Sequence, residues 1–234
     1  MKIVPNIEPK STLRLDNHNE YHEKFMRDQD EFDYFDKYYD LHKEFLQPTS
    51  MLIDIDLFHQ EINQYHSLFR QWGNNRPHIQ RYGISLFNLD GDIRGEEDIG
   101  CQPLDLAPKK YQDEKLFTTP TEVYKDMISM RPLDPLKDYY CRSSILLWHK
   151  GGSFLPHVDL KPSKQFDLRL WGNSDPDGYI FNGVGEIVDQ VEPGRMYLCD
   201  TSKWHYAKAT KDWNYTFFIS FNRTAIDFVK TLLV

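Results

Sequence analysis

Residues 141–159 read CRSSILLWHKGGSFLPHVD, and this stretch decides the fold. A hydrophobic run over residues 145–148 ends at the pair Gly151-Gly152, and a second short run, residues 154–156, leads into His157. This order is typical of a strand, a tight turn and a second strand. The polar residues that follow His157 would therefore stand at the end of a rigid β element.

Short strands of the same kind continue toward the end of the chain. Residues 166–183 read FDLRLWGNSDPDGYIFNG, residues 191–209 read VEPGRMYLCDTSKWHYAKA, and residues 215–223 read YTFFISFNR. Turn signals separate them, including Asn-Gly and Asp-Gly pairs, which tolerate positive φ in tight hairpins. The spacing predicts an antiparallel sandwich or barrel, and a mainly β (α+β) jelly roll of the double-stranded β-helix type fits best.

Three side chains in these strands could hold one metal ion. His157 and Asp159 form an H-x-D step just past a strand end, and His205 follows the hydrophobic residues 196–199 in the same way. Two imidazoles and one carboxylate make a facial site with open coordination positions, which suits Fe(II). The surrounding strands and turns distinguish this step from His18-Asn19-Glu20, whose segment has the composition of a solvated helix.

Several short motifs between about Leu52 and Arg223 point to one family. They are Ser143-Ser144-Ile145, Gly151-Gly152, Pro156-His157-Val158-Asp159, Leu168-Arg169-Leu170, Pro193-Gly194-Arg195 and His205. This pattern resembles the Fe(II)/2-oxoglutarate-dependent oxygenases, in particular the branch similar to aspartyl/asparaginyl β-hydroxylase. The resemblance implies iron bound by His157, Asp159 and His205. It also implies 2-oxoglutarate and dioxygen as cosubstrates, with Arg169 contacting a cosubstrate carboxylate.

The sequence departs from that family at one position. The family carries an arginine about ten residues after the distal histidine, where it grips the far carboxylate of 2-oxoglutarate, and Tyr215 stands there in this chain. A phenol donates one hydrogen bond but cannot form the charged, bidentate contact of a guanidinium. Either Tyr215 contacts the cosubstrate or packs in the core, and Arg142, Lys208 or Arg223 could supply the missing charge.

The alternation of residues in two strands predicts which side chains share a face. In residues 167–171, Asp167, Arg169 and Trp171 lie on one side, and the leucines lie on the other. If the polar side faces the barrel interior, Arg169 points toward the metal, and Trp171 lines the cosubstrate site or packs in the core. In the last strand, Tyr215 shares a face with Phe217, Ile219 and Phe221.

The chain divides into two predicted parts. Residues 1–50 form a helical extension, because aromatic residues recur at helical spacing among the charged residues 19–45. This stripe would pack on the domain, or serve as an arm that covers a partner or substrate. Residues 51–234 form the jelly-roll domain, with strands expected at 51–57 and 82–87 and helices at 58–72 and 121–130.

Composition excludes several classes of protein. The net charge of −8 argues against nucleic-acid binding, and no apolar run is long enough for a membrane span. The residues at the start contain no long apolar run typical of a signal peptide. The three cysteines, Cys101, Cys141 and Cys199, are far apart, which favours reduced thiols and a cytoplasmic location. Two acidic loops, residues 90–101 and 173–184, match a calcium-binding loop poorly and are interpreted as polar turns.

Three functions remain open from the sequence. The first is an Fe(II)- and 2-oxoglutarate-dependent hydroxylase of a protein side chain, peptide or amino acid. The second is a related oxygenase of another small molecule or of nucleic acid. The third is a non-catalytic, cupin-like jelly-roll module that binds a metal or a ligand. The absent arginine bears on the cosubstrate and not on the metal ligands, and a fold alone does not define a substrate.

Overall fold

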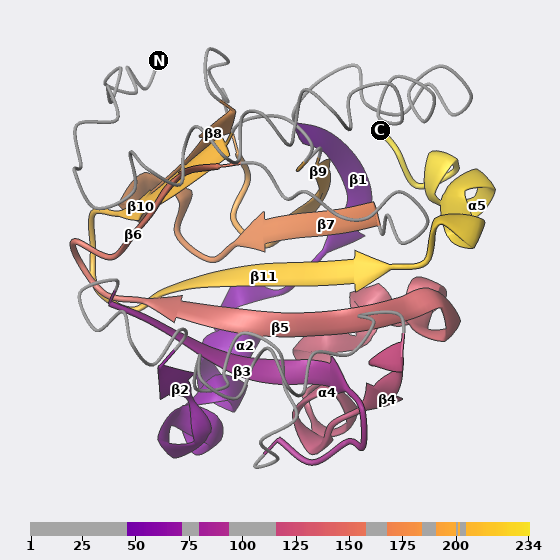
Figure 1. Ribbon diagram of the computed structural model, residues 1–234, viewed down its shortest axis with the longest axis horizontal. Coiled ribbons are helices and arrows are strands. Elements are labelled where there is room, and N and C mark those ends of the chain that lie inside the picture. Colours follow the sequence, from indigo (N-terminus) through magenta and orange to yellow (C-terminus); the bar gives the residue numbers. More distant parts are fainter. Residues whose placement is uncertain are drawn as a thin grey trace.

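The computed structural model describes residues 46–71, 80–93, 116–157, 168–183, 191–199, 201 and 205–234. Two antiparallel sheets dominate this part of the chain, and Figure 1 shows the long central strands of the larger one side by side. The main sheet has the order β1 (Leu46–Leu52), β9 (Arg195–Cys199), β7 (Leu168–Asn173), β11 (Asn214–Phe221), β5 (Tyr140–Trp148), β3 (Arg81–Asn88) and β2 (Arg70–Gln71), with β4 (Thr119–Pro120) paired to β3.

The smaller sheet has three strands in the order β6 (Ser153–His157), β10 (His205–Ala209) and β8 (Tyr179–Gly183). Successive strands of the chain alternate between the two sheets, from β5 to β6, then to β7, β8, β9, β10 and β11. Such alternation is the winding of a double-stranded β-helix, so the predicted mainly β jelly roll is confirmed.

The two faces of the main sheet belong to different cores. The inner core lies between the sheets and contains Trp148, Trp171 and Tyr197 from the main sheet with Phe181 and Ala207 from the smaller one. The outer core contains the alternate residues of the same strands, packed against the helices. This partition follows from the two-residue period of a strand, which sends neighbouring side chains to opposite faces.

Helices cover the outer face. They are α2 (Ile55–Ile62), the 3-10 helix η1 (Asn63–Leu68), α4 (Glu122–Asp126), the 3-10 helix η4 (Ile128–Tyr139), and α5 (Ile226–Lys230), which follows the 3-10 turn η7 (Arg223–Ala225). Phe58 and Ile62 of α2 are buried in the outer core with Leu133 and Leu136 of η4. Between β7 and β8 stands the short 3-10 turn η6 (Pro176–Gly178).

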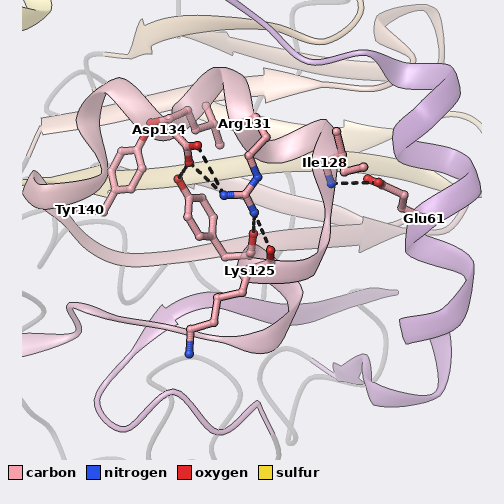
Figure 2. A network of polar contacts seen from close by, with 8 residues as sticks. Glu61, Lys125, Ile128, Arg131, Asp134 and Tyr140 are labelled. Atoms are coloured by element: carbon pink, nitrogen blue, oxygen red, sulfur yellow. Dashed lines mark hydrogen bonds and ion pairs between the residues drawn. The ribbon is translucent and has the colours of Figure 1, made fainter.

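One carboxylate fastens two of these helices to each other. Glu61 of α2 accepts a hydrogen bond from the backbone N–H of Ile128 at 2.9 Å (Figure 2). It also accepts hydrogen bonds from the backbone N–H of Ser129 at 3.0 Å and from the Ser129 hydroxyl at 2.7 Å. Nearby, the Arg131 guanidinium donates to the carbonyl of Lys125 at 2.7 Å and pairs with Asp134. The Glu61 contacts hold η4 against α2, and the Arg131 contacts hold η4 against α4, although η4 contains two prolines that interrupt a regular helix.

The predicted elements differ from the structure mainly at their boundaries. Residues 51–57 were expected as one strand, but β1 ends at Leu52 and α2 begins at Ile55. Asp54 causes the change, because its carboxylate accepts a hydrogen bond from the Leu57 N–H at 3.0 Å and caps the helix. The helix expected at 58–72 therefore starts earlier and continues as η1. The strand expected at 82–87 is confirmed as β3. The helix expected at 121–130 is shorter: α4 follows the cap residue Thr121 and ends at Asp126, and η4 begins at Ile128.

The expected boundary between residues 50 and 51 falls inside β1, which pairs with β9 in the main sheet. The described part of the sheet thus begins at Leu46, ahead of the expected domain start. The helices expected over residues 19–45 lie outside the described residues, as does most of the acidic loop at 90–101. Among the described residues, no helix is long and apolar enough to cross a membrane.

Candidate metal and cosubstrate site

The two histidines predicted as metal ligands stand on neighbouring strands. β6 and β10 run antiparallel, and His157 pairs directly with His205 in their register. Directly opposed residues of an antiparallel pair have Cβ atoms about 5 Å apart and share a face. The fold therefore brings together two residues that are far apart in the sequence, at the end of β6 and the start of β10, in the smaller sheet of Figure 1.

His205 is enclosed between the two sheets. Its side chain is 3% exposed, and it lies on the same face of β10 as Ala207 and Ala209, which belong to the inner core. Its ring meets the ring of Phe181 edge to face, with centroids 5.8 Å apart. His205 stands at the end of the smaller sheet, because β10 begins at this residue and β8 ends beside it at Gly183.

The third predicted ligand, Asp159, lies outside the described residues. Within the described ranges, no group of three His, Cys, Asp or Glu side chains is close enough to hold a metal ion. The backbone register thus pairs two of the three predicted ligands, and the H-x-D step continues from the end of β6 into the undescribed segment.

Arg169 and Trp171 face the same interior as His205. Trp171 belongs to the inner core and packs against Phe181, with ring centroids 4.6 Å apart, so Phe181 touches both Trp171 and His205. Arg169 is two residues away on the same face of β7 and is 5% exposed. Its Cζ lies 4.6 Å above the ring of Phe218. The predicted orientation of the arginine toward the interior agrees with this arrangement.

Tyr215 lies on the opposite face of the main sheet. Its ring packs edge to face against Phe58 of α2, at 5.2 Å, within the outer core. The phenol oxygen is 2.6 Å from Nε2 of His66, and burial raises the pKa of Tyr215 to about 12. Since Arg169 points into the interior, the structure does not bring Tyr215 together with it. Of the two roles considered for Tyr215, its surroundings match core packing.

The interior positions at the start of β11 are Asn214 and Thr216, and both are neutral. The Asn173 amide donates to Asn214 Oδ1 at 2.7 Å and to Thr216 Oγ1 at 3.2 Å. The Asn214 amide donates to the carbonyl of Asp175 at 2.7 Å. These polar groups are hydrogen-bonded to one another. The interior face at the start of β11 therefore carries a neutral hydrogen-bonded network and no cation.

The three other cations proposed from the sequence, Lys208, Arg223 and Arg142, do not lie at the start of β11. Lys208 is exposed on β10, between the inward-facing Ala207 and Ala209. Arg223 follows β11 in η7, at the opposite end of that strand from Asn214. Arg142 is buried on β5, next to an irregularity in the pairing of β5 with β11.

A further buried cation, Arg81, was missed by sequence reasoning. It is 6% exposed and pairs with Trp148 across β3 and β5, and its Cζ lies 5.3 Å from the centre of the Trp148 ring. Burial raises the pKa of the Tyr179 phenol, and a hydrogen bond to Thr216 and the nearby Arg81 charge partly oppose that rise. The signal was available, because Arg81, Gly83 and Ser85 alternate with Tyr82, Ile84 and Leu86 in one strand.

Comparison with known proteins adds a distant structural likeness. No family model matches the sequence, and no curated protein matches it. A solved structure that is similar over 93% of this chain and 96% of its own is a prolyl hydroxylase in complex with a hypoxia inducible factor oxygen degradation domain peptide fragment, from Trichoplax adhaerens. The TM-score is 0.44 and the sequence identity 13%. The strand order and the alternation of strands β5 to β11 between the two sheets define the jelly roll.

Proposed function

We propose that this protein is an Fe(II)- and 2-oxoglutarate-dependent oxygenase of the hydroxylase type. The observation that carries the proposal is the direct pairing of His157 with His205 at one end of the smaller sheet of a double-stranded β-helix. In this proposal His157, His205 and Asp159 hold the iron. Arg169 binds a carboxylate of the cosubstrate, and Trp171 forms the wall beside it.

The residues around this end fit such a group. Neutral imidazoles are ligands for Fe(II), and an aspartate adds the anionic ligand that a divalent ion favours. Bound there with a 2-oxo acid, the metal supplies oxidation of a C–H bond by dioxygen, coupled to decarboxylation of that acid. The buried face of Phe181 and Trp171 keeps water from the interior beside His205, and the guanidinium of Arg169 offers a fork for a carboxylate.

The substrate class in this proposal is an amino acid, a peptide or a protein side chain. The resemblance of the H-x-D and Leu168-Arg169-Leu170 motifs to the aspartyl/asparaginyl hydroxylase branch supports it. The Trichoplax adhaerens protein is named as a prolyl hydroxylase in complex with a peptide. A screen of amino acids and peptides for succinate release would identify the substrate.

Metal analysis of protein purified without oxygen tests the iron site. Wild-type protein should take up one equivalent of Fe(II), whereas H205A should lose most of it. His149→Ala is the matched control, since His149 is a partly exposed histidine beside Asp212 and outside the interior. Equal iron content in wild type, H205A and H149A would refute the assignment of His205 as a ligand.

Turnover is tested separately. Addition of 2-oxoglutarate to the anaerobic Fe(II) protein should give a visible charge-transfer band, and admission of dioxygen should release succinate. A protein that binds iron but gives neither signal would be the alternative, a non-catalytic jelly-roll module that binds a metal or ligand. Asn214 and Thr216 favour this alternative, because neither can replace the charge of an arginine at the start of β11.

A further inference from the structure

The strand β1 forms one edge of the main sheet. In the part of the chain that the structure describes, it stands last in the strand order, beside β9. An edge strand presents backbone N–H and C=O groups on its outer side, and proteins commonly protect such edges with charged side chains. The sequence of β1, LQPTSML, contains no charged residue, and Ser50 and Leu52 are exposed. The side chains of β1 therefore supply no electrostatic protection of this edge.

Residues 232–234, the guard segment, follow α5 and cover the middle of this edge. The Ser50 N–H donates to the Leu232 carbonyl at 2.7 Å, and the Val234 N–H donates to the Pro48 carbonyl at 3.1 Å. Figure 1 shows this end of the chain beside β1. The guard segment thus satisfies one outward donor and one outward acceptor of the edge strand.

The guard segment is anchored by α5 and by two apolar side chains. The Leu232 N–H donates to the Val229 carbonyl at the end of α5, at 2.9 Å. Leu232 and Leu233 are partly buried against the outer core, whereas Val234 is exposed. The bridge between Thr49 and Leu233 is isolated, so the pairing is much shorter than the seven residues of β1. Most of the edge strand lies outside the contact with the guard segment.

The outward donor and acceptor make this edge complementary to itself. The outward carbonyl belongs to the residue before Thr49, and the outward N–H belongs to the residue after it. A second copy of β1, related by a two-fold axis through Thr49, offers the same two groups in the opposite order. Ser50 of each copy would then donate to Pro48 of the other, as in an antiparallel ladder. In this register, residues 48–50 of the second copy replace the guard segment.

Two features of β1 could oppose such pairing, and neither prevents it. Pro48 has no backbone N–H, but in this register it acts only as an acceptor. The pairing of β1 with β9 is irregular between Pro48 and Leu52. The two hydrogen bonds to the guard segment nevertheless show that residues 48–50 present ladder geometry on their outer side.

We propose that the outer edge of β1 is a strand-addition site for a second copy of this chain, and that the guard segment occupies it as an autoinhibitory contact. Displacement of the guard segment frees the Ser50 donor and the Pro48 acceptor, and the edges of two copies then pair by β-augmentation. The site lies on the main sheet and uses none of the residues assigned to iron or to its cosubstrate.

Sedimentation velocity of a shortened chain tests the proposal. The full chain should sediment as a monomer, whereas a chain that ends at Thr231 should dimerise, with a dissociation constant lower by about tenfold or more. In the shortened chain, Ser50→Pro removes the outward N–H and should restore the monomer. Ser50→Ala keeps that N–H and should leave the dimer intact. Because both variants expose the same apolar surface at the vacated edge, the pair separates strand pairing from apolar association.

A full-length variant carries the test if the shortened chain lacks the circular dichroism spectrum of the wild type. Leu232→Ser combined with Leu233→Ser removes the apolar anchors but keeps every backbone group of the guard segment. This variant should dimerise more strongly than wild type, and S50P should abolish its dimer. A folded shortened chain that stays monomeric would overturn the proposal, and so would equal association of its S50P and S50A variants. Dimerisation of the full chain as strong as that of the shortened chain would also overturn it.

Discussion

The carboxylate of Glu61 offers a quantitative test of how the helical layer is held on the sheet. Glu61→Ala removes three hydrogen bonds that join α2 to η4, and it leaves the buried Ser129 backbone N–H without its acceptor. Hydrogen bonds to a charged acceptor contribute about 1.5–3 kcal/mol when well buried, and this carboxylate is partly exposed. We therefore expect E61A to lower the free energy of unfolding by about 2 kcal/mol, equivalent to a fall in Tm of roughly 4–8 °C.

The pH dependence of this effect has a definite sign. Burial by itself raises the pKa of Glu61, but the hydrogen bonds from Ser129 and Ile128 and the charge of Arg131 outweigh burial and lower it. A carboxyl whose pKa is lower in the folded state stabilises the fold above its ordinary pKa. That contribution is lost as the pH falls from the ordinary value of 4.5 through the lowered one. The difference between wild type and E61Q should therefore shrink as the pH falls below about 4.

Urea unfolding followed by circular dichroism, at several pH values between neutrality and mild acid, measures both effects. Asp138→Asn is the control, because Asp138 is an exposed carboxylate on the same 3-10 helix. D138N should change stability by less than about 0.5 kcal/mol. A loss for E61A no larger than that of D138N would refute the reasoning, and so would a difference between wild type and E61Q that stays constant with pH.

Three further substitutions test the packing around the site. Tyr215→Phe should cost about 1 kcal/mol of stability by removing the contact with His66. It should leave the Fe(II) content unchanged, and a fall in that content would contradict the outward placement of the ring. Gly194→Ala should lower the free energy of unfolding by about 3 kcal/mol or more, because φ is +77° and a Cβ would lie 2.1 Å from the Ile53 carbonyl oxygen. A Tm close to that of the wild type would contradict this. Asn173→Ala should cost about 2 kcal/mol by opening the amide network, and calorimetric unfolding would show the loss.

The main features of the fold could be predicted from the sequence because they depend on local alternation. The hydrophobic residues 145–148 and the alternation in residues 167–171 predicted the strands and placed Arg169 on the same face as Trp171. The turn residues predicted where strands end. The start of α2 was not predicted, because Met51, Ile53 and Ile55 alternate with acidic residues as in a strand. The helix begins at Ile55 because Asp54 caps it.

The candidate site was predictable in part. The proximity of His157 and His205 follows once β6 and β10 pair, and the strand context predicted that pairing. The outward direction of Tyr215 could not be predicted from the sequence, because alternation shows which residues share a face but not which of the two faces is inside. Arg81 escaped for a related reason. The alternation over residues 81–86 shows that Arg81 shares a face with Gly83 and Ser85, but the burial of that face depends on the long-range pairing of β3 with β5.

The inward direction of His205 also limits how this chain can change in length. Two backbone hydrogen bonds, Gly151 N–H to the Ala209 carbonyl and Ala209 N–H to the Gly152 carbonyl, fix the far end of β10 against the start of β6. Deletion of a single residue between these bonds and His205 would turn the imidazole to the outside of the barrel. Loss of two residues would restore its direction but move it away from His157. Length variation among relatives should therefore avoid this strand and collect in the connections that precede it.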